Sequence, residues 1–540
     1  MKQILYYFTL LAVLAGCSER TVVKGSWSFS PEPREIYSAD SSFVINGKTA
    51  IVCSASLGNE ASLLADYLYE ITNIRPEIKE QAGEHSIILS LDPAIGSNLE
   101  DFRREECYSV NVSADVVSIS AASSKGIFHG IQSFCKSLPA SIGKGELAAA
   151  PAGRIFDYPE YRYRAFMLDC ARHFFSVETV KRVIDILAVH KINYFHWHLT
   201  EDQGWRLEIK KYPRLTEVGS WRAGSPVEGG EGHDGIPVSG FYTQDEAREV
   251  VRYAAARGIT VIPEIDMPGH MQAALASYPS LGCTGGPYEV ACRYGVLDDV
   301  LCVGRDASIE FIKDVLSEVM DIFPSEYIHL GGDECPKVRW KECAHCQARI
   351  KELGIKAKGS KTAEELLQSW FMDEIARFVE ERGHKVIAWN DVLLGWNNVV
   401  SGAPSKNTII AGWMRPVSTD IAVKEGYNAI LCPCGHVYFS AREGNALTGD
   451  AYLKRVFDLP VPPAGLSEEE AKRIIGIEAC IWTEHVSTED VIQWQMLPRL
   501  SALAELQWAD PARRNYAAFL ERLSRMTALY SARGWQWNSN

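Results

Sequence analysis

The chain has 540 residues and a formal net charge of −14 at pH 7. This length exceeds that of one compact domain, so we expect one large domain with smaller additions. The acidic balance argues against nucleic acid as a partner, because phosphate binding needs clustered Lys and Arg side chains. The 14 Trp and 22 Tyr residues fit either core packing or stacking against a ligand.

The first 16 residues have the pattern of an export signal rather than of a folded segment. Lys2 precedes an apolar run, and Leu14-Ala15-Gly16-Cys17 places small residues before a cysteine. This pattern resembles a bacterial lipoprotein signal that is cut before Cys17, with a lipid then attached to that cysteine. The alternative is an ordinary secretory signal that happens to contain a cysteine. The apolar run is too short to span a membrane.

We therefore predict a signal peptide over residues 1–16 and a lipidated linker over residues 17–32. The protein would be an outer-membrane-anchored lipoprotein of a Gram-negative bacterium, on the periplasmic or the surface face. It would contact the membrane only through the lipid on Cys17. The sequence carries no signal for an oligomeric state.

Residues 33–153 have the pattern of a small α/β domain. Strands are expected at Ser86–Leu91, Tyr108–Ser113 and Val116–Ala121, and a helix at Gly126–Leu138. The segment Ala148–Gly153 is rich in alanine and contains a proline, so we expect the domain boundary there.

From about Tyr161 onward, short apolar runs alternate with amphipathic helices, which predicts parallel βα units. The expected strands are Arg164–Leu168, Ile192–His198, Thr260–Glu264, Tyr327–Gly331, Lys385–Trp389, Thr408–Gly412, Asn428–Cys432 and Ile475–Trp482. The expected helices include Val177–His190, Gln244–Arg257, Ser308–Ile322, Ala363–Arg382, Ser418–Glu425 and Val491–Leu506. Eight units predict a (β/α)₈ TIM barrel over residues 154–510. Residues 511–540 would add a helix, Tyr516–Ser531, and a tail that packs on the barrel.

The carboxyl ends of barrel strands form the active site of enzymes with this fold. Those ends are rich in acids, histidines and tryptophans here: Asp169, Arg172 and His173; Glu201 and Asp202; Glu264, Asp266 and His270; Asp333 and Glu334; Trp389 and Asp391; Trp413; His436 and Tyr438; Trp482 and Glu484. Aromatic faces stack on the apolar side of a sugar ring, and carboxylates and Arg bind its hydroxyls. This composition favours a carbohydrate as the substrate.

Metal chemistry is the alternative, because His196 and His198 end the second strand. No His-Glu-x-x-His motif accompanies them, and alternate residues share one face of a strand, so both could simply be buried and hydrogen-bonded. We therefore predict neither a catalytic metal nor a cofactor.

The cysteines form two local groups: Cys335, Cys343 and Cys346, with His345 nearby, and Cys283, Cys292 and Cys302. Zinc is one interpretation of the first group, but it holds only three thiols, whereas a structural zinc usually has four ligands. Export permits disulfides. We favour one or two loop disulfides, with no pairing assigned.

Asp333 and Glu334 are the outstanding carboxylates, and they are adjacent in sequence. A glycosidase normally places two carboxylates on opposite sides of the scissile bond. Neighbouring side chains at a strand end diverge, so one of the pair can donate a proton while the other orients another part of the sugar. This arrangement is expected where the substrate supplies its own nucleophile, such as a 2-acetamido oxygen.

Four segments carry a resemblance to a known family: Arg164-Ala-Phe-Met-Leu-Asp-Cys-Ala-Arg-His-Phe174, Phe195-His-Trp-His-Leu-Thr-Glu-Asp-Gln-Gly-Trp205, Pro263-Glu-Ile-Asp-Met-Pro-Gly-His270 and His329-Leu-Gly-Gly-Asp-Glu334. They resemble β-N-acetylhexosaminidases of glycoside hydrolase family 20, over most of the chain to about Asp510. The resemblance implies a small α/β domain before a (β/α)₈ barrel. It also implies exo-acting release of terminal β-linked GlcNAc or GalNAc with retention, through an oxazolinium intermediate and without a cofactor.

The resemblance also implies roles for individual residues. Glu334 would be the general acid and then the base, and Asp333 would orient the acetamido group. The other implied roles are an acetamido contact by Tyr438, pocket walls by Trp370, Trp389 and Trp482, hydroxyl binding by Arg172 and Glu484, and tuning of Glu334 by His270 with Glu201 and Asp266.

Two positions depart from the commoner pattern of the family. Glu201 stands where an Asp is usual, and Ser440 stands where many members carry an acid that contacts the outer hydroxyls. With Arg442 nearby, the lost negative charge suggests that a sugar with a sulfate at O6 could be accepted, since Arg suits oxyanions.

Two other functions stay open. A lacto-N-biosidase would release a disaccharide and need a longer pocket, whereas Arg172 and Glu484 favour a pocket for one sugar. A glycan-binding lipoprotein without activity would have little use for both Asp333 and Glu334.

Overall fold

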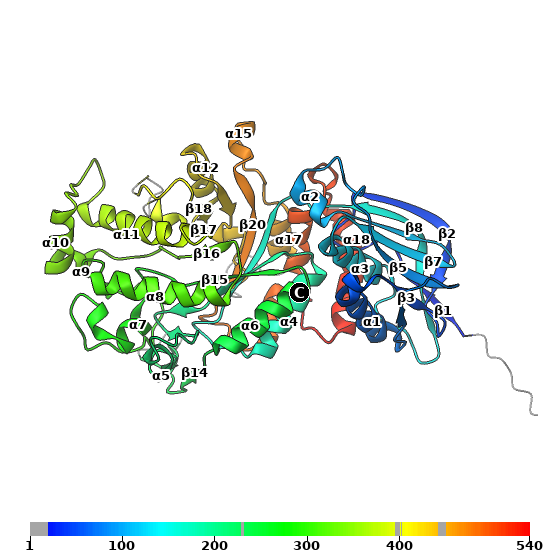
Figure 1. Cartoon of the computed structure of the whole chain (residues 1–540), viewed down its shortest axis with the longest axis horizontal. Helices are drawn as coiled ribbons and strands as arrows, with labels where there is room; N and C mark the ends of the chain where they lie inside the picture. The colour runs from blue at the N-terminus through cyan, green and yellow to red at the C-terminus, as the bar shows by residue number, and fades with distance from the viewer. Residues whose placement is uncertain (1–19, 228–231, 395–399, 401, 441–449, 540) are drawn as a thin grey trace, which may run out of the picture.

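The computed structural model describes residues 20–227, 232–394, 400, 402–440 and 450–539. It contains an open sheet near the amino terminus and a closed barrel that makes up most of the chain (Figure 1). The predicted (β/α)₈ barrel preceded by a small α/β domain is confirmed. Among the described residues, no helix is long and apolar enough to cross a membrane.

The amino-terminal sheet has the strand order β1-β8-β6-β7-β5-β3-β4, and β2 also pairs with β8. Its strands are β1 (Val22–Lys24), β2 (Glu35–Val44), β3 (Ala50–Val52), β4 (Glu77–Lys79), β5 (Ser86–Leu91), β6 (Tyr108–Val112), β7 (Val116–Ala121) and β8 (Leu147–Asp157). The helices α1 (Gly58–Thr72), α2 (Asp101–Glu106) and α3 (Ser124–Ser137) belong to the same domain. The three strands and the helix expected here are confirmed.

Two sequence expectations about this domain were wrong. The segment Val22–Lys24, which we placed in a linker, forms β1 and pairs in parallel with β8. The expected boundary at residue 153 lies inside β8, which continues to Asp157. The alanines of this segment are buried in the sheet, so the small side chains reflect close packing rather than a flexible connection.

The barrel closes in the order β10-β15-β16-β17-β18-β19-β20-β9, with every pair parallel. Its strands are β9 (Tyr163–Asp169), β10 (Tyr194–His198), β15 (Thr260–Glu264), β16 (Tyr327–His329), β17 (Lys385–Trp389), β18 (Ile409–Gly412), β19 (Ala429–Leu431) and β20 (Ile474–Ile481). All eight predicted strands are therefore confirmed. The main helices between them are α4 (Val177–Val189), α6 (Gln244–Ala255), α8 (Asp306–Ile322), α11 (Ala363–Glu380) and α12 (Pro416–Lys424).

The helix expected over Val491–Leu506 is in fact two helices. They are α16 (Glu489–Met496) and α17 (Arg499–Trp508), separated at Pro498. Proline lacks a backbone N–H and its ring clashes with the preceding turn, so it ends a helix. Pro498 lies within the expected range, so the sequence itself indicates a break there.

The small domain contacts the barrel at the amino ends of its strands. Glu106 of α2 accepts a hydrogen bond from Asn193, just before β10, and pairs with Arg164 at the start of β9. Lys191 binds Asp157 at 2.8 Å, and neither side chain is exposed. These buried ion pairs join the two domains at the end of the barrel that lies opposite the strand carboxyl ends.

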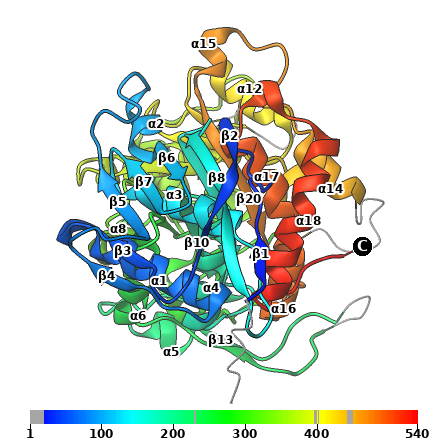
Figure 2. The same cartoon turned by 90° about the vertical axis from the view of Figure 1, so that its right-hand side faces the viewer.

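The carboxyl-terminal helix α18 (Tyr516–Ala532) touches both domains, and Figure 2 shows it beside the amino-terminal sheet. Tyr530 hydrogen-bonds His190 and Ser501 of the barrel, at 2.8 and 2.6 Å. On its other side, Arg525 donates to the carbonyl of Leu138 after α3. The helix thus ties the small domain to the barrel.

Candidate active site

A cavity of about 460 Å³ opens at the carboxyl ends of the barrel strands. Ligand pockets in proteins have volumes of about 300–1,000 Å³. Seven residues that the sequence singled out line it: Arg172, Asp333, Glu334, Tyr438, Ser440, Trp482 and Glu484. Four to which the sequence assigned no role also line it: Tyr294, Trp413, Cys434 and His485, of which only Trp413 was expected at a strand end.

The turn after β16 carries Asp333 and Glu334, and two glycines make it possible. Gly331 and Gly332 have φ angles of 65° and 98°, in the region that favours glycine. A Cβ on Gly331 would lie 1.7 Å from Oδ1 of Asp266, so only glycine lets that carboxylate pass beneath the turn. The Asp266 oxygen then accepts a hydrogen bond from the N–H of Gly332 at 3.0 Å. Asp266 is therefore a support of the turn.

Two of the five described non-glycine residues with a positive φ angle are neighbours at this site. Glu334 and His270 have φ angles of 43° and 53°, which non-glycine residues rarely adopt. Each such residue costs about 1–3 kcal/mol, and residues of this kind cluster at functional sites. The fold thus bears a conformational cost that places these two side chains against each other.

Asp333 is buried, and its Oδ1 has no hydrogen-bond partner among the described residues. Burial, opposed by His270 and reinforced by the Glu334 carboxylate, raises the pKa of Asp333 to about 6. An unpartnered oxygen in a buried carboxylate costs free energy unless a ligand supplies the missing donor. Asp333 is therefore placed to accept a hydrogen bond from a bound molecule.

His270 lies between the acid pair and a second pair of carboxylates. Its Nε2 is 3.8 Å from Asp333 and 3.6 Å from Glu334. Its Nδ1 is 3.0 Å from Glu201 and 3.2 Å from Asp202. Burial alone would lower the pKa of His270. The Glu201 carboxylate and the hydrogen bond to Asp202 outweigh burial and raise that pKa well above its usual value. A positive His270 is thus held beside the acid pair.

The sequence named Glu201 as a partner of His270 but missed Asp202, which follows it directly. Glu201 also binds Arg172 at 2.5 Å. Burial alone would raise the pKa of Glu201. The positive charges of Arg172 and His270 outweigh burial and hold that pKa well below its usual value. Glu201 therefore stays negatively charged between Arg172 and His270. Its side chain, one methylene longer than that of the usual Asp, reaches both.

Arg172 forms one wall of the cavity. Its guanidinium lies 4.8 Å from the ring centroid of Trp482 and 3.4 Å from Asp169. Burial raises the pKa of Glu484, while Arg172 acts in the opposite direction. A cation and a carboxylate at one wall can bind the hydroxyls of a sugar as donor and acceptor.

Trp413, Tyr438 and Trp482 line the other walls, whereas Trp389 lies behind Trp482 and does not itself line the cavity. Trp389 is buried, and its indole N–H donates to Glu264 at 2.8 Å. Its ring centroid lies 5.8 Å from that of Trp482, which in turn lies 6.0 Å from that of Tyr438. Trp413 stacks on Tyr438 with centroids 6.3 Å apart. Trp413 ends a predicted strand, and that position was the signal that could have assigned it to the site.

Trp370 was wrongly predicted as a wall of the cavity. Gln368 and Met372, four positions apart on α11, face the site: Gln368 donates to the carbonyl of Gly332 at 2.8 Å, and Met372 lies against the same glycine. Trp370 lies between them in sequence and thus on the opposite face of the helix. Its ring lies 5.2 Å from the guanidinium of Arg349 instead.

Beneath the cavity, His196 and His198 lie inside the barrel with no exposed surface. The imidazole of His196 lies 2.9 Å from Glu478 and 3.0 Å from Glu264. His198 also pairs with Glu264. Both histidines are buried and hydrogen-bonded, and through Glu264 they support Trp389.

Ser440 lies at the rim of the cavity. Arg442, which the sequence placed beside it, lies outside the described residues, and so does Cys17.

Models of protein families match two parts of the chain. Residues 161–511 match the catalytic domain of glycosyl hydrolase family 20, and residues 28–158 match domain 2 of the same family. The chain belongs to glycosyl hydrolase family 20. Residues 1–18 match the lipid attachment site of prokaryotic membrane lipoproteins, in agreement with the predicted lipoprotein signal.

Individual family 20 proteins are similar over most of the chain. A beta-hexosaminidase of Porphyromonas gingivalis is 39% identical over 507 residues, which are 91% of this chain and 62% of that protein. An exo beta-N-acetylglucosaminidase from Vibrio harveyi, solved in complex with N-acetylglucosamine, has a TM-score of 0.81 and 31% identity, and covers 96% of this chain and 79% of that one. A beta-N-acetylhexosaminidase from Bacteroides fragilis has a TM-score of 0.78 and 31% identity, over 94% and 96% of the two chains.

Proposed function

We propose that this chain is an exo-acting β-N-acetylhexosaminidase that releases terminal β-linked GlcNAc or GalNAc with retention of configuration. The observation that carries the proposal is the buried Asp333 carboxylate with one unpartnered oxygen, next to Glu334 in an aromatic cavity. The family membership and the named activities of the similar proteins support it.

Asp333 and Glu334 have different roles: Asp333 orients the acetamido group, and Glu334 transfers protons. The free oxygen of Asp333 accepts the N–H of the 2-acetamido group and turns the acetamido oxygen toward C1 of the sugar. That oxygen attacks C1, and Glu334 protonates the leaving oxygen; the products of this step are the aglycone and an oxazolinium ion held against Asp333. Glu334 then takes a proton from water as the water attacks C1, which restores the acetamido group.

The surrounding residues hold the sugar. Trp482, with Trp389 behind it, and Tyr438 enclose the acetamido group and the apolar ring face, and Arg172 and Glu484 bind the outer hydroxyls. A wall built from Arg172 and Glu484 ends the cavity at one sugar, so it favours a terminal residue over the disaccharide of a lacto-N-biosidase. No cofactor takes part in these steps.

Substrate assistance is tested by weakening the substrate's own nucleophile. We expect kcat/KM to fall steeply along aryl glucosaminides with N-acetyl, N-fluoroacetyl, N-difluoroacetyl and N-trifluoroacetyl groups, because fluorine withdraws electrons from the attacking carbonyl oxygen. The rates are measured by release of the same phenol from each compound. A protein carboxylate acting as nucleophile would give nearly equal rates along the series, and that result would contradict the proposal.

Acceptance of a sugar with a sulfate at O6 rests on Ser440 and Arg442. We expect Arg442→Ala to lower kcat/KM for p-nitrophenyl 6-sulfo-GlcNAc by about 10–100-fold, since a hydrogen bond to a charged group contributes about 1.5–3 kcal/mol. The effect on plain p-nitrophenyl GlcNAc should be much smaller. Equal effects of the substitution on both substrates would show that Arg442 does not bind the sulfate.

We infer that the mature chain is held at the outer membrane of a Gram-negative bacterium by a lipid on Cys17. The match to a lipoprotein attachment site supports this inference. Mass spectrometry of the mature protein should find an amino-terminal cysteine at position 17 that carries a diacylglyceryl group. An unmodified amino terminus would contradict the anchor.

A further inference from the structure

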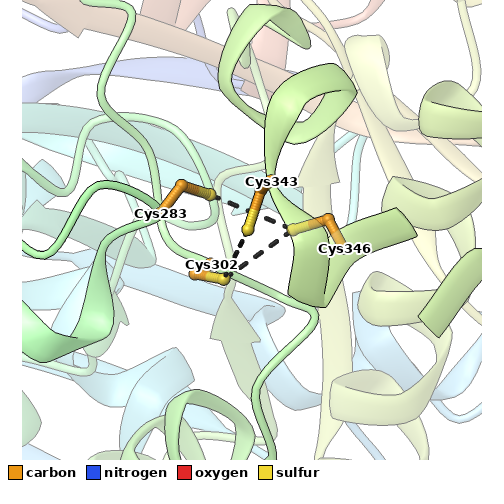
Figure 3. A group of neighbouring side chains, drawn as sticks. All are labelled: Cys283, Cys302, Cys343 and Cys346. Carbon is orange, nitrogen blue, oxygen red and sulfur yellow. Dashed lines mark hydrogen bonds between the residues drawn. The ribbon is translucent and has the colours of Figure 1, made fainter. Parts of the chain in front are cut away.

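Four cysteine side chains meet between two loops that follow neighbouring barrel strands (Figure 3). Cys283 and Cys302 belong to the segment between β15 and α8, and Cys343 and Cys346 to the segment between β16 and α11. The four sulfur atoms all lie within 4.8 Å of one another. Three of the side chains are buried, and only Cys283 is partly exposed. The sequence grouped Cys343 and Cys346 with Cys335, but the Cys335 sulfur contacts the carbonyl of Pro336 and lies outside the group of four. The other two thiols come from a loop that is distant in sequence.

The spacing of the sulfur atoms fits a tetrahedral metal site. The distances are 3.6 Å from Cys302 to Cys343, 3.8 Å from Cys302 to Cys346 and 3.9 Å from Cys283 to Cys346. Zinc–thiolate bonds of about 2.3 Å give tetrahedron edges of about 3.8 Å. Cys302 and Cys346 each approach two other sulfurs, whereas a disulfide would join each sulfur to one partner.

The backbone is arranged to bring the two loops together. The N–H of Cys302 donates to the carbonyl of Leu281 at 2.8 Å, so the segments that carry Cys283 and Cys302 run side by side. A Cβ on Gly304 would lie 2.4 Å from the backbone N of Cys346, so glycine alone permits this approach. The four thiols therefore converge because the main chain places them there.

Cys343 and Cys346 lie at the start of α10 (Ala344–Glu352), in a Cys-x-x-Cys spacing. Cys343 is the residue before the first turn, and Cys346 lies within that turn. The first backbone N–H groups of a helix have no partner in the helix and favour negative charge nearby. They can stabilise thiolates bound to a cation at this position.

We propose that Cys283, Cys302, Cys343 and Cys346 bind one structural zinc ion. Four sulfur ligands close the coordination sphere, and no position stays open for water, so the ion acts on the fold and not on the sugar. Binding releases the four thiol protons to solvent and leaves a Zn(Cys)₄ centre with a charge of −2. Tetrahedral sulfur sites select zinc or iron, and zinc is the redox-inert choice.

The zinc would fasten together the two loops that carry the acid site. The N–H of Leu301 donates to the carbonyl of Pro268, two residues before His270, at 2.9 Å. The carbonyl of Leu301 accepts a hydrogen bond from the indole N–H of Trp340, also at 2.9 Å. Trp340 lies six residues after Glu334 in the chain. Loss of the ion should therefore loosen His270 relative to the acid pair.

Neighbouring residues provide matched controls. Cys292 lies in the same loop as Cys283 and Cys302, but its sulfur contacts the carbonyl of Val290 and stands outside the group of four. His345 lies between Cys343 and Cys346 in sequence, yet its side chain is exposed. Substitution of Cys292 or His345 should therefore leave the metal in place.

The test measures metal in the purified mature chain, held in detergent and never exposed to chelator. We expect one zinc ion per chain by plasma mass spectrometry, and four sulfur neighbours at about 2.3 Å by zinc X-ray absorption. Cys302→Ser and Cys343→Ser should each lower the zinc content about tenfold or more, while Cys292→Ser and His345→Ala keep it. The cluster variants should also unfold at a lower temperature than the controls.

Wild-type protein keeps the proposal testable if the cluster variants fail to fold. Protein from cells supplied with cobalt should show the thiolate-to-cobalt absorption of a tetrahedral sulfur site. Mass spectrometry after alkylation in denaturant, with chelator and without reductant, should find all four cysteines alkylated. Two disulfides among them, iron in place of zinc, or zinc retained by both cluster variants would overturn the proposal.

Discussion

Replacing Asp333 by Asn is expected to lower kcat/KM for p-nitrophenyl GlcNAc by about 10²–10³-fold, the range seen when one preorganised electrostatic contact is lost. The amide keeps the size of the side chain but loses the negative charge that faces the acetamido N–H and the oxazolinium ion. Asp185→Asn is the control, because that carboxylate binds Tyr253 and Arg257 outside the cavity. A rate for Asp333→Asn above one-tenth of wild type would contradict the assigned role.

The pH profile separates this role from a structural one. Asp333 must be ionised to accept the N–H, and burial raises its pKa to about 6. The kcat/KM of wild type should therefore fall as the pH drops through about 6, since more of the free enzyme then carries a protonated Asp333. The Asn variant should lose this acidic limb and keep a low, flat rate there. If the Asn variant kept the same fall in kcat/KM at acidic pH, a group other than Asp333 would be responsible for it.

Much of the site could be predicted because residues that follow parallel strands in the sequence lie together on one face of the barrel. Once the apolar runs are recognised as barrel strands, their carboxyl ends must lie on one face, and Arg172, Asp333, Trp482 and Glu484 follow. These residues lie at strand ends or in the turns directly after them. No knowledge of helix packing is needed to place them.

The failures arose where a side chain's direction depends on tertiary packing. Trp370 lies on a helix with apolar residues on several faces, so the sequence does not reveal which face meets the barrel. The partners of Cys343 and Cys346 lie about 40–60 residues away, in a loop whose path the pattern does not define. The domain boundary was wrongly placed inside β8 because a strand of small buried residues and a flexible linker can both be rich in alanine.

Replacing Glu334 by Gln should produce a loss that depends on the leaving group. For an unactivated leaving group, such as the second sugar of a GlcNAc disaccharide, we expect kcat/KM to fall by about 10²–10⁴-fold, the usual contribution of general acid catalysis. For 2,4-dinitrophenyl GlcNAc the fall should be small, because this phenolate leaves without a proton. The two substrates are compared under the same conditions, with phenol release and reducing-sugar formation as the measurements.

The second half of the reaction gives an independent readout on the same variant. Water must still lose a proton as it attacks the oxazolinium ion, and Gln cannot accept that proton, so the intermediate should accumulate on the dinitrophenyl substrate. Both kcat and KM then fall together while kcat/KM holds. Azide attacks without a base, so adding it should raise kcat and yield the β-glycosyl azide. If both substrates lost rate equally and azide had no effect, Glu334 would be a structural support of the turn, and the proton donor would have to be sought among its neighbours in the cavity.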